Sequence, residues 1–402
     1  MAHETLRTEE LTVVVGDNED GTGEHSHHRA GYNGVWSLTS VHAPDNCFVP
    51  SVSGLNLEHL MDELFMTEEG GEIFEPRQHP MQLERLSDTS VRLLQETSPL
   101  TGVSSSTTFT VREPHAIDMT FEATLTKPPR AGKAFGFFWA SYINAPDSPA
   151  LQFVDPDGIW CCLNPDGHGD DSGNTVCHAG VDAIWGDPRQ EYNKHSLTHS
   201  FSQRRFDQPL MFGRPGDGSM LYAQMFDQQQ PVRLCMSPSG GGLNKERRLR
   251  NPAWDFQYII DEATVGTQCS LRTRVVYHRV PERQVRLQPE PPAAHLRLVD
   301  TLEVEPGRFE TFLERELARR ADHRCVDSLA ELLEADKAVT VEGQVRQGSR
   351  HEKDDRSRVD DPRSWILGRS NARKVEALEA ALDEVRARLA GLDRDVETVE
   401  AR

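Results

Sequence analysis

The chain has 402 residues, and its 64 acidic and 44 basic side chains give a formal net charge of −20 at pH 7. So acidic a chain is poorly suited, as a whole, to non-specific adhesion to nucleic acid. No run approaches the ~20 apolar residues of a membrane span, and MAHETLRTEE lacks an apolar signal-peptide core, so no membrane partner is expected. Seven scattered cysteines without a CxxC pair indicate reduced thiols in the cytoplasm, and they make a structural zinc site improbable.

Residues 1–30 are acidic, polar and Gly-rich, which predicts a mostly disordered arm. The arm has room for one short strand at most, at Leu11–Val15. His25, His27 and His28 could bind a metal ion, but no carboxylate pair or cysteine nearby would fix the ligand geometry. A solvated His-rich tail is therefore the favoured interpretation of the arm.

Residues 31–270 change character, because short β-branched and aromatic runs recur between Gly, Pro, Asn and Asp. This pattern predicts a mainly β domain with the architecture of a β-sandwich, a jelly roll or a super-sandwich. The alternation in Ser105–Val111 and Ile117–Leu125 predicts strands with one wet face. The almost continuously apolar Phe135–Ile143 predicts a strand buried on both faces, and Trp139 and Trp254 are expected to pack in the core.

Long loops rich in Asp, Gly, Asn and His fill residues 144–199, and loops of that length are usually functional or disordered. Aromatic rings beside polar side chains can form a platform for a glycan. The candidate ligand-binding residues are Trp160, Asp166, His168, His178 and Trp185. The candidate ligands for a divalent metal are His168, Asp170, Asp171 and His178. A capped polar loop without a ligand is the simpler alternative for this segment.

A second constellation lies at the turn between two predicted strands, where Arg112 and Pro114 flank the residues of interest. Glu113 and His115, with Asp118, form a possible acid/base set, because a carboxylate beside an imidazole can transfer protons. A salt bridge at the rim of the sheet is the alternative. No arrangement of Cys161 or Cys162 with a histidine specifies a nucleophile.

After the Pro-rich linker Pro281–Pro292, the sequence predicts a small α/β piece. Helices are expected at Glu310–Ala321 and Ser328–Leu333, and strands at Val275–Tyr277 and Leu298–Val304. The last segment predicts a coiled coil, because its apolar residues recur in alternating steps of three and four. The interface positions are Val375, Leu378, Leu382, Val385, Leu389, Leu392 and Val396. A helix with so narrow an apolar seam requires a partner helix, from a second copy in an oligomer or from another coiled-coil chain. The alternative is that the helix folds back on its own domain.

Two strings in this region carry a resemblance: CVDSLAELLEADKAVTVEGQVRQGSRHEKDDRSRVDD and WILGRSNARKVEAL. With LRTRVVYHRV from Leu271 onward, they resemble the hinge exit and coiled coil of SMC-like ATPases of the MukB and JetC type, from Wadjet plasmid defence. The resemblance implies a hinge-like fragment at 271–345, a charged turn and coiled-coil helix at 346–402, and SMC-like complex subunits as partners. The phosphate-cradling GxxxxGK[ST] loop is absent from the sequence, so we expect no ATP binding and no other cofactor beyond a possible divalent metal.

The charged turn also offers a DNA-facing patch made by Arg346, Arg350, Lys353 and Arg356. Asp354 and its neighbours weaken that interpretation, and a solvated turn is the alternative. For the whole chain, the sequence favours a non-catalytic interaction protein that joins a β-sandwich binding domain to an SMC-like fragment. The first alternative is a carbohydrate-binding or carbohydrate-active β domain, and the second is a subunit of an SMC-like plasmid-defence complex. Whether the chain is an enzyme stays open.

Overall fold

The computed structural model describes residues 2–65, 74–167, 172–181, 200–280, 285–287, 297–304, 310–340, 344–348 and 350–353. The chain divides into two compact units, Met1–Val280 and Pro281–Arg402. The first unit therefore extends beyond the predicted boundary at residue 270, because a strand that runs to Arg279 belongs to it. No helix in the described part of the chain combines the length and the apolar character that a membrane crossing requires.

Residues near the N-terminus form a three-stranded antiparallel sheet instead of the expected disordered arm. Its strands are β1 (His3–Arg7), β2 (Leu11–Gly16) and β3 (Gly34–Ser40). Strand β2 is the short strand expected at Leu11–Val15, and it folds because Leu6, Leu11 and Val13 are buried in the core. The sequence predicts disorder here because polar and acidic residues surround these short strands.

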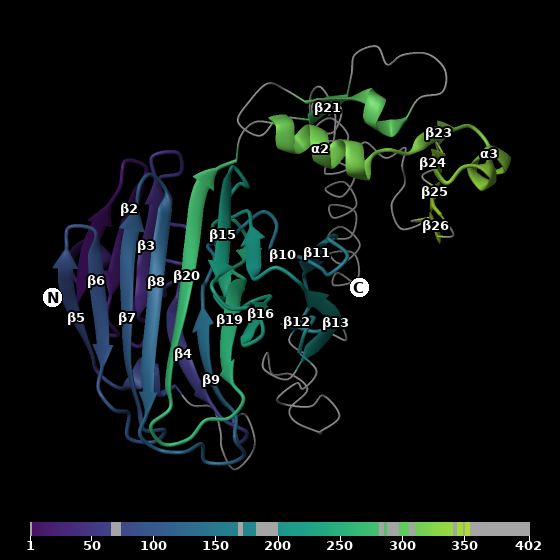
Figure 1. The fold of residues 1–402 in the computed structure, drawn as a ribbon. Helices are drawn as coiled ribbons and strands as arrows, with labels where there is room; N and C mark the ends of the chain where they lie inside the picture. Colours follow the sequence, from purple (N-terminus) through teal and green to yellow (C-terminus); the bar gives the residue numbers. More distant parts are fainter. Residues whose placement is uncertain are drawn as a thin grey trace, which may run out of the picture. The chain divides into compact units, whose positions relative to one another are not determined.

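The largest sheet has nine strands, each antiparallel to its neighbours (Figure 1). In order across the sheet they are β11 (Trp160–Leu163), β10 (Leu151–Val154), β14 (Leu210–Gly213), β15 (Met220–Phe226), β20 (Gln268–Arg279), β8 (Ala116–Leu125), β7 (Val103–Arg112), β6 (Ser90–Gln95) and β5 (Met81–Ser87). Burial alternates along β7 and β8, which confirms the prediction of one buried and one wet face.

A six-stranded sheet forms the second layer of this unit. Its strands, in order, are β13 (Phe201–Phe206), β12 (Thr175–His178), β16 (Val232–Ser237), β19 (Ala253–Ile260), β9 (Phe135–Ala140) and β4 (Asn56–Met61). Only the β12–β13 pair is parallel among these neighbours. Every residue of β9 is buried, as its apolar sequence predicts.

The two larger sheets pack face to face through aromatic side chains, which makes the unit a β-sandwich. Phe121 of the nine-stranded sheet meets Trp139 of the six-stranded sheet edge-on, with ring centroids 4.8 Å apart. Tyr222 and Trp254 make a second contact between the same sheets at 5.9 Å. Both tryptophans are 0 % exposed, which confirms that they belong to the core. Short elements complete the unit: η1 (Gly23–His25), α1 (Glu75–Gln78), β17 (Leu243–Asn244) and β18 (Leu249–Arg250).

The second unit is a small α/β piece, but the strand predicted at Val275–Tyr277 belongs to β20 of the first unit, and Leu298–Thr301 forms a 3-10 helix instead of a strand. Its elements are β21 (Val285–Leu287), η2 (Leu298–Thr301), β22 (Leu302–Val304), α2 (Glu310–Arg320), β23 (Arg324–Val326), α3 (Leu329–Glu334), β24 (Lys337–Thr340), β25 (Gln344–Gln347) and β26 (Arg350–Lys353). Helix α3 begins at the N-cap residue Ser328, whose hydroxyl accepts the Glu331 N–H, and the Glu331 carboxylate accepts the N–H of the preceding residue, Asp327. Its small core contains Val326, Leu332 and Ala338.

The resemblance to an SMC hinge and coiled coil is wrong for the described residues. It begins at Leu271, which lies inside β20, where β15 and β8 flank it in the sandwich. The three α-helices that the structure describes are short, eleven residues at most, and none forms a coiled coil. The predicted seam positions lie outside the described residues: Val375, Leu378, Leu382, Val385, Leu389, Leu392 and Val396.

Two buried titratable residues, Asp17 and His28, contact the Trp36 indole in the first unit. His28 stacks on that ring at 3.8 Å, and the indole N–H donates to the backbone oxygen of Asp17. Burial raises the pKa of the Asp17 carboxyl to about 6 and lowers the pKa of the His28 imidazole to about 4. His28 therefore belongs to the core rather than to a solvated tail.

These two pKa shifts predict opposing pH dependences of stability. From pH 4 to 6.5 the unfolded chain holds the His28 proton more tightly, so stability rises with pH. From pH 3.8 to 6 the folded chain holds the Asp17 proton more tightly, so stability falls with pH. After screening by solvent, each effect should amount to about 1–2 kcal/mol. Urea unfolding across this range should show a steeper rise of stability with pH for Asp17→Asn than for wild type, and a shallower one for His28→Gln. Parallel curves for all three chains would contradict the assignment.

Candidate functional site

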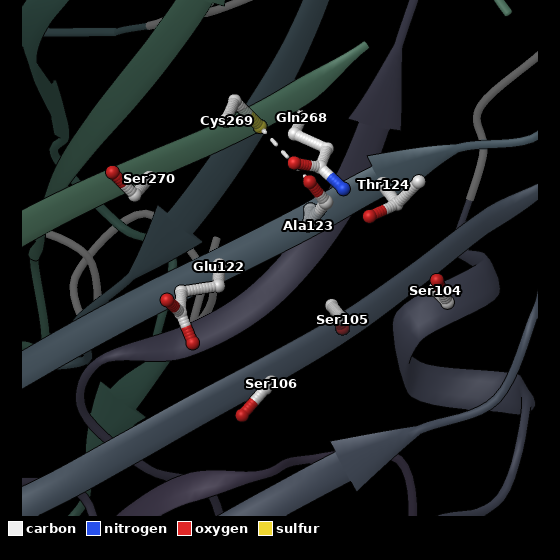
Figure 2. A pocket seen from close by; sticks show the side chains of 9 residues that line it. All are labelled: Ser104, Ser105, Ser106, Glu122, Ala123, Thr124, Gln268, Cys269 and Ser270. Carbon is white, nitrogen blue, oxygen red and sulfur yellow. Dashed lines mark hydrogen bonds between the residues drawn. The ribbon is translucent and has the colours of Figure 1, made fainter. Parts of the chain in front are cut away.

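The outer face of the nine-stranded sheet is a polar surface crossed by rows of small side chains. One row joins Ser104, Thr124 and Gln268, and the next joins Ser106, Glu122 and Ser270, because these residues pair across β7, β8 and β20. These rows line an open hollow of about 530 Å³. Figure 2 shows the side chains that line it, with the Cys269 thiol donating to the Ala123 carbonyl. Its lining contains no aromatic side chain, so the hollow has the character of a solvated sheet face.

On the same face, toward one end of β7, β8 and β20, charged side chains form ion pairs. The Asp118 carboxylate accepts hydrogen bonds from Arg112 at 2.9 Å and from Arg274 at 2.6 and 2.9 Å. Partial burial alone would raise the pKa of Asp118, but the hydrogen bonds from Arg274 and Arg112 outweigh it and hold the pKa below its usual value. Asp118 is therefore a bridging anion between two guanidinium groups, an arrangement that suits a salt bridge rather than proton transfer.

The other two residues of the predicted acid/base set lie in the turn after β7. The strand ends at Arg112, so Glu113 and His115 do not share a strand face. The Glu113 carboxylate accepts the backbone N–H of Glu9 at 2.9 Å. His115 lies beside Glu10 and His278, and these three residues form the one group in the described chain that offers metal-ligand atoms at close range. Glu113, His115 and Asp118 therefore each have different partners in the structure and do not form one acid/base set.

A more enclosed pocket lies where loops meet at the end of the sandwich; we call it the loop pocket. Its volume is about 420 Å³, and polar and apolar residues line it together. The polar lining consists of His42, Asp45, Asn46, Asn144, Asp217, Ser219 and Arg247. The remaining lining consists of Ala43, Pro44, Cys47, Pro215, Gly216, Met220 and Tyr277.

Hydrogen bonds between loops fix the polar groups of this pocket. The Asp217 carboxylate accepts the Ser219 N–H at 2.9 Å, and the Arg247 guanidinium donates to the Ala145 carbonyl and to Asp147. The backbone N–H of Asp147 donates in turn to the Gly216 carbonyl at 2.8 Å. The loops that carry the carboxylate and the guanidinium are therefore joined before any ligand arrives, which is the preorganisation that binding sites require.

The charges of the loop pocket are set by these contacts. Hydrogen bonds from Ser219, assisted by the positive charge of Arg247, lower the pKa of Asp217 and keep this carboxyl ionised. Burial raises the pKa of Tyr277, and the negative charges of Asp217 and Asp45 raise it further, so the phenol stays protonated. The pocket offers carboxylate acceptors, a guanidinium and a neutral phenol, without a surplus of positive charge for a phosphate.

No family model matches the chain, and no curated protein does. Solved structures with a similar arrangement include an aldose 1-epimerase candidate from Escherichia coli K12, at 10% identity and a TM-score of 0.40, covering 69% of this chain and 99% of that chain. A GalM/aldose epimerase homologue from C. elegans is similar at 9% identity and a TM-score of 0.37, with coverage of 70% and 100%. A 4-alpha-glucanotransferase from Thermococcus litoralis, at 9% identity and a TM-score of 0.37, covers 69% of this chain and 37% of that chain.

Overlaps this low carry no activity over to this chain. The residues from Leu271 onward form β20, which pairs with β15 and β8 inside the sandwich and not in a hinge. The predicted identity as an SMC-like fragment is corrected accordingly, and a role in a Wadjet complex has no support in the described residues.

The predicted ligand-binding and metal residues are only partly described. Trp160 lies on edge strand β11, 51 % exposed, and meets the Phe212 ring edge-on at 4.9 Å. The His178 Nδ1 atom accepts the Gly180 N–H at 2.9 Å, which stabilises a turn at the end of β12. Asp166 is exposed in the loop after β11. The remaining members of both sets lie outside the described residues: His168, Asp170, Asp171 and Trp185.

The predicted DNA-contacting residues are likewise only partly described. Arg346 donates to the carbonyls of Gly348, Leu332 and Leu333, so its guanidinium ties the β25 hairpin to the end of α3. Arg350 and Lys353 are the first and last residues of β26. Arg356 lies outside the described residues. DNA contact therefore stays a prediction. Of the predicted cations, Arg346 already donates hydrogen bonds within the fold.

Proposed function

We propose that the first unit is a carbohydrate-binding domain and that the loop pocket holds the sugar. The lining of that pocket carries the proposal: two carboxylates, two amides and a guanidinium surround apolar Pro and Tyr surfaces in a cavity of about 420 Å³. Sugar hydroxyls both donate and accept hydrogen bonds, so they match acceptors such as Asp217 and donors such as Arg247. The C–H faces of a sugar ring match apolar lining such as Tyr277.

Electrostatics support a neutral ligand over an anionic one. Two carboxylates, Asp45 and Asp217, face a single guanidinium, and Asp147 already pairs with that guanidinium from outside the lining. An anionic ligand would have to approach uncompensated negative charge, whereas a polyol would not. All seven cysteines lie in described segments, and each carries a thiol rather than a disulfide, which supports a cytoplasmic location.

A glycan array followed by calorimetry with the best ligand tests this proposal. Asp217→Asn keeps the side-chain shape but removes the charge, and we expect it to weaken binding roughly 10- to 100-fold, since hydrogen bonds to charged groups are worth about 1.5–3 kcal/mol. Asp157→Asn, in an exposed turn away from the pocket, is the matched control and should bind like wild type. Wild-type protein that binds no glycan on the array, or Asp217→Asn protein that binds at wild-type affinity, would overturn the proposal.

A further inference from the structure

Three residues that are far apart in sequence bring metal-ligating atoms together at one end of the nine-stranded sheet. Glu10 directly precedes β2, His115 directly precedes β8, and His278 lies near the end of β20. The Glu10 Oε2 atom lies 3.1 Å from His278 Nδ1 and 3.4 Å from His115 Nδ1. Each residue offers one ligand atom, and the three atoms lie within 4.8 Å of one another.

We propose that Glu10, His115 and His278 form a binding site for a divalent transition-metal ion of the zinc type. Ligands about 2.0–2.2 Å from a tetrahedral ion lie roughly 3.3–3.6 Å from each other, and the two measured carboxylate–imidazole separations are close to that spacing. Two imidazoles with one carboxylate favour Zn²⁺, Co²⁺ or Ni²⁺ over Ca²⁺ and Mg²⁺, which prefer oxygen ligands.

Backbone hydrogen bonds hold the three ligands before an ion binds. The Glu10 N–H donates to the Pro114 carbonyl at 3.3 Å, and the Tyr277 N–H donates to the His115 carbonyl at 3.0 Å. Glu113 strengthens the first connection, because its carboxylate accepts the N–H of Glu9. The turn that carries Glu10 is thus joined to the turn that carries His115, and that turn is joined to the strand that carries His278.

The same contacts could exist without an ion, as a carboxylate shared by two imidazoles. What favours an ion is the geometry: the two imidazoles, with ring centroids 4.1 Å apart, lie beside the same carboxylate oxygen and form a set of three donor atoms with it. The side chains of Glu10, His115 and His278 are 21 %, 22 % and 41 % exposed, which leaves a side open for a water molecule as fourth ligand.

Titration of the chelator-treated full chain with Zn²⁺ by calorimetry, and with Co²⁺ by visible absorption, tests the site. We expect one tightly bound ion with the absorption of tetrahedral Co²⁺. His278→Gln and Glu10→Gln should each weaken binding at least 10-fold, the lower end of what even indirect ligand support contributes. His79→Gln, a half-buried histidine near α1, is the matched control and should retain the ion.

The outcomes separate this site from the sugar pocket. Asp217→Asn should bind the ion like wild type, even where it has lost glycan binding, so failure of one proposal leaves the other standing. Circular dichroism and a thermal melt in chelator establish that each variant is folded. Unchanged Zn²⁺ affinity in folded His278→Gln and Glu10→Gln chains, or no binding by wild type, would overturn the metal site.

Discussion

Replacing Trp139 by alanine should lower the free energy of unfolding by about 3–5 kcal/mol, the usual cost of removing a large buried ring. The side chain is 0 % exposed in the middle of the sandwich. Its ring lies parallel to Phe256 at 4.9 Å and meets Phe121 edge-on at 4.8 Å. Removing it therefore opens a cavity between the two sheets, and urea unfolding at pH 7 measures the loss.

Two further variants show whether packing is the cause. Trp160→Ala removes a ring that is 51 % exposed and should cost no more than about 1 kcal/mol. Trp139→Phe should cost clearly less than Trp139→Ala, because it keeps an aromatic ring and removes an indole N–H that has no hydrogen-bond partner among the described residues. A Trp139→Ala chain within 1 kcal/mol of wild type would contradict the central position of this ring.

Arg77→Met should destabilise the protein by about 3–5 kcal/mol at pH 8, because it strands a buried carboxylate. The side chain of Glu58 is 7 % exposed and accepts hydrogen bonds from Arg77 at 2.9 Å and from Tyr142 at 2.9 and 2.8 Å. Burial raises the pKa of Glu58, and Arg77 counteracts that rise. Without Arg77, the folded chain should take up a proton at Glu58, so the loss of stability should shrink as the pH falls toward 5.

A double-mutant cycle identifies the pair as the source of this effect. Glu58→Gln combined with Arg77→Met should lose less than the sum of the two single changes, because no uncompensated charge remains. Arg92→Met, which breaks the exposed pair with Glu84, is the matched control and should cost about 0–1 kcal/mol at either pH. A loss from Arg77→Met that is equal at pH 5 and pH 8 would show that its packing on Tyr32, rather than its charge, matters.

Local patterns in the sequence predict the strands of the sandwich well. The apolar run at Phe135 becomes β9, buried on both faces, and the alternation after Ser105 and Ile117 becomes β7 and β8 with one wet face. These predictions are confirmed because successive side chains of a strand point to opposite faces of the sheet. The order of apolar and polar residues therefore shows which face is buried. The helices at Glu310 and Ser328 follow from local capping and spacing in the same way.

The candidate sites depend on which strands become neighbours, and residue order does not record that. Glu10, His115 and His278 meet only because β20 lies between β15 and β8 and the turn before β2 joins the turn before β8. The acid/base pattern drew attention to His115 but gave no sign of its partners. The loop pocket likewise combines Asp217 with Arg247, from two separate stretches of the sequence that carry no recognisable motif.

The position of β20 determines where the chain can be shortened. A cut after residue 270 would delete most of this strand and leave β15 and β8 with rows of unsatisfied backbone N–H and C=O groups in the interior of one sheet. Such groups invite pairing with other chains and aggregation. A cut after Val280 keeps the whole ladder, so domain-by-domain expression of this protein should begin with residues 1–280.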